Sequence, residues 1–162
     1  MVGASQHRTA EFNAEMSTQL QNRNKVNYLR VLLGGLVAGL VINIGEYLLN
    51  EVVLVRQMEE TFRRLSLPRP GGNFIAVAVF LTLLLGIVIV LLYAMIRQRF
   101  GPGPRTAVVA GLIVWFCIYI YAGILTGTLV AIPVHLLGLG IFWGLVEYSF
   151  GAVLGAWVYK EA

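Results

Sequence analysis

Four long stretches of apolar residues, separated by short segments rich in polar residues, glycine or proline, dominate the pattern along this chain. Each stretch exceeds the length of about 20 apolar residues that a helix needs to cross the hydrocarbon core of a bilayer. The stretches are continuous, whereas the strands of a membrane barrel alternate apolar and polar residues over about ten positions. We therefore predict an all-α membrane protein with four transmembrane helices in a bundle. The predicted spans cover residues 28–49, 73–96, 106–130 and 134–159, within one transmembrane domain over residues 28–159.

A shorter segment between the first and second spans has a different pattern. Leu54, Met58, Phe62 and Leu65 recur at spacings of four, four and three residues, and mostly polar or charged residues lie between them. This period is typical of an amphipathic helix. We predict such a helix over residues 51–67 at the outer membrane interface, where it either covers the outer end of the bundle or docks a partner protein.

The residues before the first span, 1–27, are polar and include Glu11 and Glu15. They lack the short apolar core and the small-residue cleavage site of a secretory signal peptide. We expect them to form a polar cytoplasmic N-terminal tail.

Composition and charge narrow the class of protein. Apolar residues make up 58% of the chain and charged residues 12%, against about 45–50% and about 25% in soluble globular proteins. This balance excludes a water-soluble enzyme, a disordered regulator and a nucleic-acid binder. Lys and Arg are twice as frequent on the side of the two termini as on the opposite side, which predicts cytoplasmic termini. We expect a multi-pass integral protein of a bacterial-type inner or cytoplasmic membrane.

Pairs of glycines four residues apart mark candidate contacts between these helices. Small residues at this spacing let two helix backbones approach closely inside a membrane. The pattern occurs four times, at Gly35 and Gly39, Gly123 and Gly127, Gly140 and Gly144, and Gly151 and Gly155.

Polar residues continue two of these glycine stripes. At about 100° per residue, Asn43, Glu46 and Asn50 fall on the glycine face of the first span. Glu147 falls on the glycine face of the fourth span. We expect spans one and four to bury these faces against other helices, with a direct contact between the two spans as one arrangement. The second span, which has few small or polar residues, is expected to face lipid over much of its circumference.

Glu46 and His135 are candidates for function because an ionisable group inside a membrane is costly. Both are expected near the outer interface, where a contact between them is geometrically reasonable. Three interpretations remain open for this pair: hydrated or hydrogen-bonded interfacial residues, an entry site for a proton or cation, or a ligand to a metal or pigment.

Glu147 is expected deeper in the membrane. We predict that it is a neutral acid, hydrogen-bonded to Trp115, Tyr119, Asn43 or a partner protein, because burial disfavours a charged carboxylate. Trp115 and Tyr119 also lie too deep for an interfacial belt, so their N–H and O–H groups need partners inside the protein. Three interpretations remain open for Glu147: an acid that holds helices together, a site for proton-coupled transport, or a group that binds a partner's cofactor or a partner's arginine.

The sequence carries no catalytic signature, and we expect no enzyme activity, no metal site and no cofactor of its own. A contact from His135 to a partner's pigment or haem is a minor hypothesis. The favoured function is a non-catalytic accessory or assembly subunit of a larger integral membrane complex, with an energy-transducing complex as one option. Its partners would be other integral membrane subunits and lipid. The alternative is a small homodimeric proton- or cation-coupled transporter that uses Glu46 and Glu147.

Overall fold

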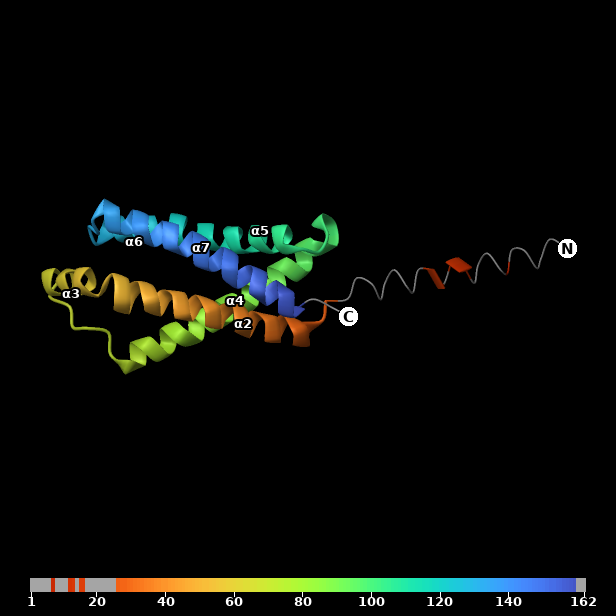
Figure 1. Ribbon diagram of the computed structural model, residues 1–162, viewed down its shortest axis with the longest axis horizontal. Helices are drawn as coiled ribbons and strands as arrows, with labels where there is room; N and C mark the ends of the chain where they lie inside the picture. Colours follow the sequence, from red (N-terminus) through yellow and green to blue (C-terminus); the bar gives the residue numbers. More distant parts are fainter. Residues whose placement is uncertain (1–6, 8–11, 14, 17–25, 160–162) are drawn as a thin grey trace.

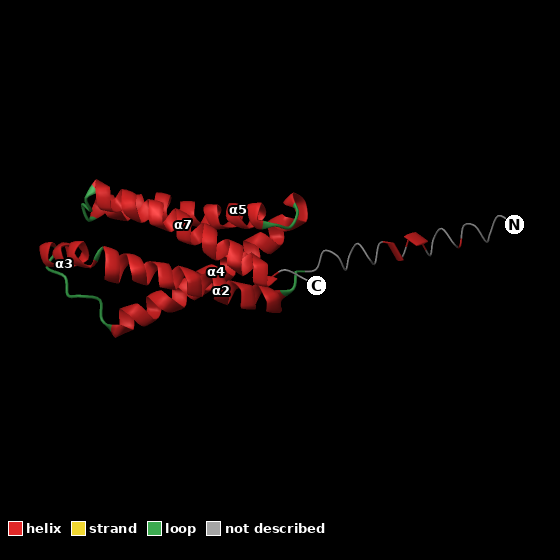
Figure 2. Cartoon of the chain, viewed as in Figure 1, coloured by secondary structure: helices red, strands yellow, loops and turns green. Residues whose placement is uncertain are grey.

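The computed structural model describes residues 7, 12–13, 15–16 and 26–159. Most of the predicted N-terminal tail lies outside the described residues. Within those residues the chain is all-helical, without a strand (Figure 2). Four helices are long and apolar enough to cross a membrane, as the hydrophobic pattern predicts.

The first of these helices covers Tyr28–Val53 in two pieces. The α-helix α2 (Tyr28–Tyr47) begins after Asn27, whose side-chain oxygen accepts a hydrogen bond from the Arg30 amide at 3.1 Å. Such a cap satisfies one of the free amides at a helix start. The π-helix η1 (Leu48–Val53) follows without a break. The amphipathic helix α3 (Val55–Arg64) comes next, inside the predicted 51–67 range, with no fully buried residue.

The second long helix, α4 (Gly72–Phe100), ends where Gly101 adopts a φ of 82°, a conformation that favours glycine. Pro104 then opens the third span at the first helical position, where proline is tolerated because no amide partner is needed. This span has three pieces: α5 (Pro104–Trp115), the π-helix η2 (Phe116–Gly123) and α6 (Ile124–Leu129). The fourth span is the single helix α7 (Val134–Tyr159).

The helices lie in two layers in Figure 1. One layer holds α2 and α3, and the other holds α5 and α6. Helix α7 runs obliquely from beside α6 to the level of α2, where the chain ends. Helix α4 runs obliquely across α2 and joins the second layer where it connects to α5. Helix α2 packs on both α4 and α7, and α5 packs on α7. We call the end that carries Tyr28 and Tyr159 the terminal end, and the end that carries α3 the loop end.

Helix α2 packs through two different small-residue faces. Gly35 and Gly39 lie against the backbone of α4, where Gly86 faces them. Gly34 faces Gly155 of α7 instead. The predicted glycine stripe of the first span thus packs on the second span, and the contact with the fourth span uses residues one position earlier. The second span is buried where it crosses α2, so it does not face lipid all along its length.

The other predicted glycine pairs contribute unequally. In the fourth span, Gly151 packs on Ile42 of α2, whereas a side chain at Gly140 would meet nothing within 4 Å. In the third span, Gly127 lies against Leu137, and Gly123 faces only a carbonyl of its own helix. The four sequence patterns therefore do not mark four equivalent helix contacts.

Candidate functional site

Tyr119 brings the two intramembrane carboxyl groups together. Its hydroxyl oxygen lies 2.6 Å from Oε1 of Glu46 and 3.0 Å from Oε1 of Glu147. The three residues come from three different spans: Glu46 from α2, Tyr119 from η2 and Glu147 from α7. One hydrogen-bonded chain therefore joins the two layers of the molecule.

Two more side chains complete this cluster. The Asn50 amide nitrogen donates to Oε2 of Glu46 at 3.0 Å and to the Glu46 carbonyl at 2.8 Å. The indole nitrogen of Trp143 lies 3.1 Å from both Oε2 of Glu147 and the Gly45 carbonyl. We call these five residues, Glu46, Asn50, Tyr119, Trp143 and Glu147, the carboxyl cluster.

Glu147 is the most buried member of the cluster, and the other four are half-buried. Glu147 is 13 residues from the first residue of α7 and 12 from the last, and it is only 6% exposed. Two glycines provide the space that it needs. A side chain at Gly45 would collide with the Glu147 carboxyl group, and one at Gly144 would collide with the Tyr119 ring. Gly45 and Gly144 thus leave space for the side chains of the cluster, whereas other glycines allow helix backbones to approach.

Both π-helices of the structure are next to the cluster. Tyr119 lies inside η2, and η1 begins two residues after Glu46 and contains Asn50. A π-helix has a wider turn than an α-helix, and insertions of this kind occur frequently at functional sites. Spans one and three are therefore interrupted at the level of the carboxyl groups although no proline lies in or next to either π-helix.

All the hydrogen-bond partners of the two carboxyl groups are neutral. Among the described residues, neither Glu46 nor Glu147 forms an ion pair with Lys, Arg or His. The Tyr119 hydroxyl has one hydrogen and can donate it to only one carboxyl group. The second contact is a hydrogen bond only if that carboxyl group carries a proton and donates it to the tyrosine oxygen. The arrangement is thus suited to holding one proton between two acids.

The two carboxyl groups differ in burial. Glu147 is 6% exposed, whereas Glu46 is half-buried. Each accepts one further hydrogen bond from a neutral donor, Asn50 for Glu46 and Trp143 for Glu147.

Some of the predicted site residues lie elsewhere. His135 is exposed at the start of α7, and in the described part of the chain no hydrogen bond or ion pair joins it to Glu46. Trp115 donates to the Ile141 carbonyl at 3.0 Å, and Asn43 donates to the Gly39 carbonyl at 2.9 Å. Of the three partners expected within the chain for Glu147, the structure supplies only Tyr119.

Trp143 is the member of the cluster that the sequence analysis missed. It lies four residues before Glu147 on the same helix, and residues at this spacing are neighbours on a helix surface. That spacing was the available signal. Its second partner, the Gly45 carbonyl on α2, depends on helix packing and has no signal in the local sequence.

A metal would find few ligands here. No group of three or more His, Cys, Asp or Glu side chains gathers within residues 26–159 or the few described residues before them. Two carboxyl groups are the titratable acids that this site offers.

In comparisons with known proteins, no protein-family model, no curated protein and no solved structure matches the chain. The functional argument therefore depends on the geometry of the carboxyl cluster.

Proposed function

We propose that the chain is a small proton- or cation-coupled membrane transporter in which Glu46, Tyr119 and Glu147 bind the coupling ion. The observation that carries this proposal is the hydrogen-bonded chain from Glu46 through Tyr119 to Glu147. Intramembrane acids without a basic partner are typical of proton relays in pumps and transporters. The geometry thus favours the transporter over the accessory subunit that the sequence alone favours.

The cluster provides a chemical reason for coupling. When Glu147 carries the proton, each oxygen–oxygen contact of Tyr119 is a hydrogen bond. When the proton leaves, two carboxylates face one hydroxyl in a site of low dielectric constant, and like charges repel strongly there. Because the contacts join α2 to η2 and α7, loss of the proton weakens the connection between the layers. A cation that binds between the two carboxylates would restore it.

The proposal includes a membrane arrangement. Lys and Arg are enriched on the side of the termini, which supports cytoplasmic termini. Four helices rarely enclose a pathway alone, so we propose that the transporter works as a homodimer. Its open surface would include Gly140 of α7, where no atom lies within 4 Å of an added Cβ.

Exchange of protons for cations tests the transport proposal. The purified chain would be placed in liposomes with an acidic interior and an internal pH-sensitive dye, and Na⁺, K⁺ or tetramethylammonium would be added outside. We expect at least one cation to accelerate proton loss. Glu147→Gln should abolish the effect because glutamine keeps hydrogen-bonding atoms but cannot release a proton.

Glu51→Gln is the matched control, since Glu51 lies exposed in η1 outside the cluster. It should retain the wild-type rate. Equal rates for wild type, Glu147→Gln and empty liposomes with all three cations would contradict the transport proposal.

The accessory subunit is the second candidate, and the open position at Gly140 of α7 supports it. A partner helix that packs at Gly140 would be displaced by Gly140→Leu. No atom of this chain lies within 4 Å of an added Cβ at Gly140, so the substitution tests the partner contact. Gly144→Leu is unsuitable as the test because Gly144 already contacts the Tyr119 ring of the same chain. If the subunit hypothesis is correct, Gly140→Leu removes a co-purifying membrane protein and Glu147→Gln leaves it bound.

A further inference from the structure

The terminal end of the molecule contains a pocket that is separate from the carboxyl cluster. Its volume is about 460 Å³, which is within the range of about 300–1,000 Å³ that small-molecule sites occupy. Tyr93 of α4 lines one side, and Val153, Ala156 and Trp157 of α7 line another. The turn 102–104 between α4 and α5 closes the third side. The walls are therefore mostly apolar.

Hydrogen bonds and ring contacts hold the walls of this pocket in place. The Gly103 amide donates to the Tyr93 hydroxyl at 3.3 Å, and the Thr106 hydroxyl donates to the Gly101 carbonyl at 2.8 Å. The rings of Tyr93 and Tyr159 meet edge to face with centroids 6.0 Å apart. The turn between α4 and α5 is thus fixed against α4 and α7.

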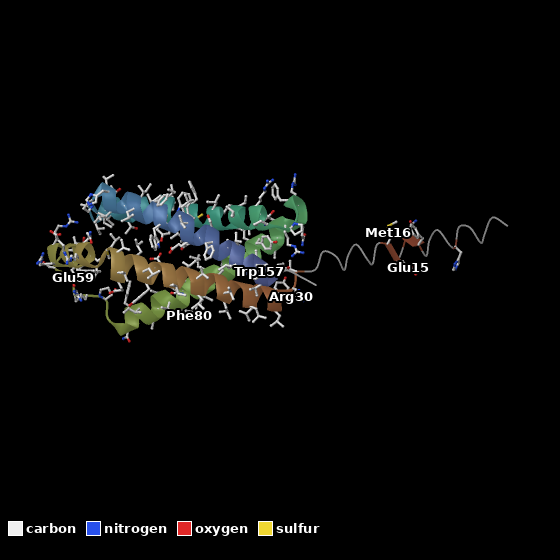
Figure 3. All side chains as sticks on the ribbon, viewed as in Figure 1. Glu15, Met16, Arg30, Glu59, Phe80 and Trp157 are labelled. Atoms are coloured by element: carbon white, nitrogen blue, oxygen red, sulfur yellow. The ribbon has the colours of Figure 1, made fainter. Side chains whose placement is uncertain are left out.

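The position of the pocket matches the region of lipid headgroups. It lies where α4 ends and α5 begins, at the boundary of two spans. Trp157 is 70% exposed and lies at this terminal end, as does Arg30 (Figure 3). Tryptophan is enriched at membrane–water interfaces because its ring is apolar and its N–H is polar.

Basic residues lie on both sides of the turn that closes the pocket. Arg99 and Arg105 flank the turn on either side and are exposed. The sequence contains no acidic residue between Glu60 and Glu147, so all the charged residues near the connection from α4 to α5 are basic. Basic pockets between transmembrane helices bind the anionic head groups of phospholipids.

We propose that this pocket binds one anionic phospholipid. Its acyl chain packs against Tyr93, Val153 and Trp157, and its phosphate lies beside Arg99 and Arg105. The proposal depends on the apolar walls together with the basic turn, and it is independent of the transport proposal.

Native mass spectrometry of the full-length chain tests the site, with phosphatidylglycerol and phosphatidylcholine of the same acyl chains as probes. We expect one phosphatidylglycerol to bind in preference to phosphatidylcholine. Arg99→Gln with Arg105→Gln should weaken its binding about 30-fold, or about fivefold for each arginine. Val153→Trp should lower the binding of both lipids because it fills the pocket.

Arg56→Gln with Arg63→Gln is the matched control, since both arginines lie exposed on α3 at the loop end. It should leave phosphatidylglycerol binding unchanged, and the melting temperature of each variant would establish that it is folded. Equal affinity for the two lipids would overturn the proposal. So would an equal loss in the two arginine pairs, or displacement of phosphatidylglycerol by inorganic phosphate at similar concentration.

Discussion

The Tyr119 hydroxyl carries one hydrogen but contacts two carboxyl groups. Both contacts are hydrogen bonds when one of the two acids is protonated, because the hydroxyl then donates to one acid and accepts from the other. Asn50 and Trp143 supply the remaining donors, so each carboxyl group has two neutral partners.

Removal of the Tyr119 hydroxyl should lower the stability of the protein although the ring remains. Tyr119→Phe leaves Glu147 with the Trp143 contact alone, and a buried polar group that loses its partner costs about 1–3 kcal/mol. We expect the free energy of unfolding in detergent to fall by that amount. Tyr121→Phe is the control, because Tyr121 is 70% exposed in the same π-helix. Equal stability of the two variants would show that the hydroxyl contacts contribute nothing.

Most residues of the cluster could be identified from the sequence, but which of them contact one another could not. Glu46, Glu147 and Tyr119 each stand out because an ionisable or phenolic group inside a span needs a partner. From the position of each residue along its span, we expected Glu46 near His135 and left several possible partners for Glu147. The structure selects among them because η2 and α2 fix which side chains meet.

At the scale of the elements, glycines set the distance between α2 and its two neighbours. Gly86 of α4 is a position where a side chain has no space, because an added Cβ would collide with the backbone of Gly35 and Gly39. In a membrane such close backbone contacts replace the hydrophobic driving force, which is absent between helices in lipid.

Gly86→Ala should therefore destabilise the protein. The methyl group would force α2 and α4 apart, and overpacking typically costs about 1–3 kcal/mol. Gly138→Ala, where nothing lies within 4 Å, should be neutral or stabilise by up to about 1 kcal/mol through helix propensity. Unfolding in mixed detergent would measure both variants, and a Gly86→Ala variant as stable as Gly138→Ala would refute the close contact.

Helix α3 is attached to the loop between α6 and α7 by one side chain. The Arg64 guanidinium donates to the Ala131 carbonyl at 2.9 Å and to the Val130 carbonyl at 3.4 Å. This bond joins the two layers at the loop end, where the Arg69–Glu59 ion pair also links α3 to the segment that follows it.

Arg64→Gln should release α3 with little loss of overall stability, because bonds of exposed side chains contribute little. We expect faster hydrogen exchange of the α3 amides and unchanged exchange in α7. Arg63→Gln, with its neighbouring exposed side chain, should leave both helices unchanged. Protection of α3 that stays at the wild-type level in Arg64→Gln would rule out this attachment.

The four spans were predictable from the sequence because length and hydropathy alone decide them. Their interruptions were not. No proline lies in or next to η1 or η2, so the wider turns have no local signal in the sequence. The sequence also could not show which helix each glycine contacts, since Gly34 and Gly35 are adjacent in sequence but face different helices.

At the scale of the whole molecule, α2 and α7 meet in two different ways. Towards the terminal end they meet through Gly34 and Gly155, a close contact between small residues. Towards the loop end they meet through the polar side chains of the carboxyl cluster. The transport proposal requires the contacts at the loop end to open while the glycine contact stays closed.

The central claim is that Glu46 and Glu147 share one proton, and infrared titration of the purified chain in lipid tests it most directly. The account predicts a carboxylic-acid C=O signal at neutral pH in the wild type. Glu147→Gln should remove this signal, and Glu51→Gln should leave it intact. A wild-type protein without a protonated carboxyl group at neutral pH, or a signal that survives in Glu147→Gln, would contradict the account.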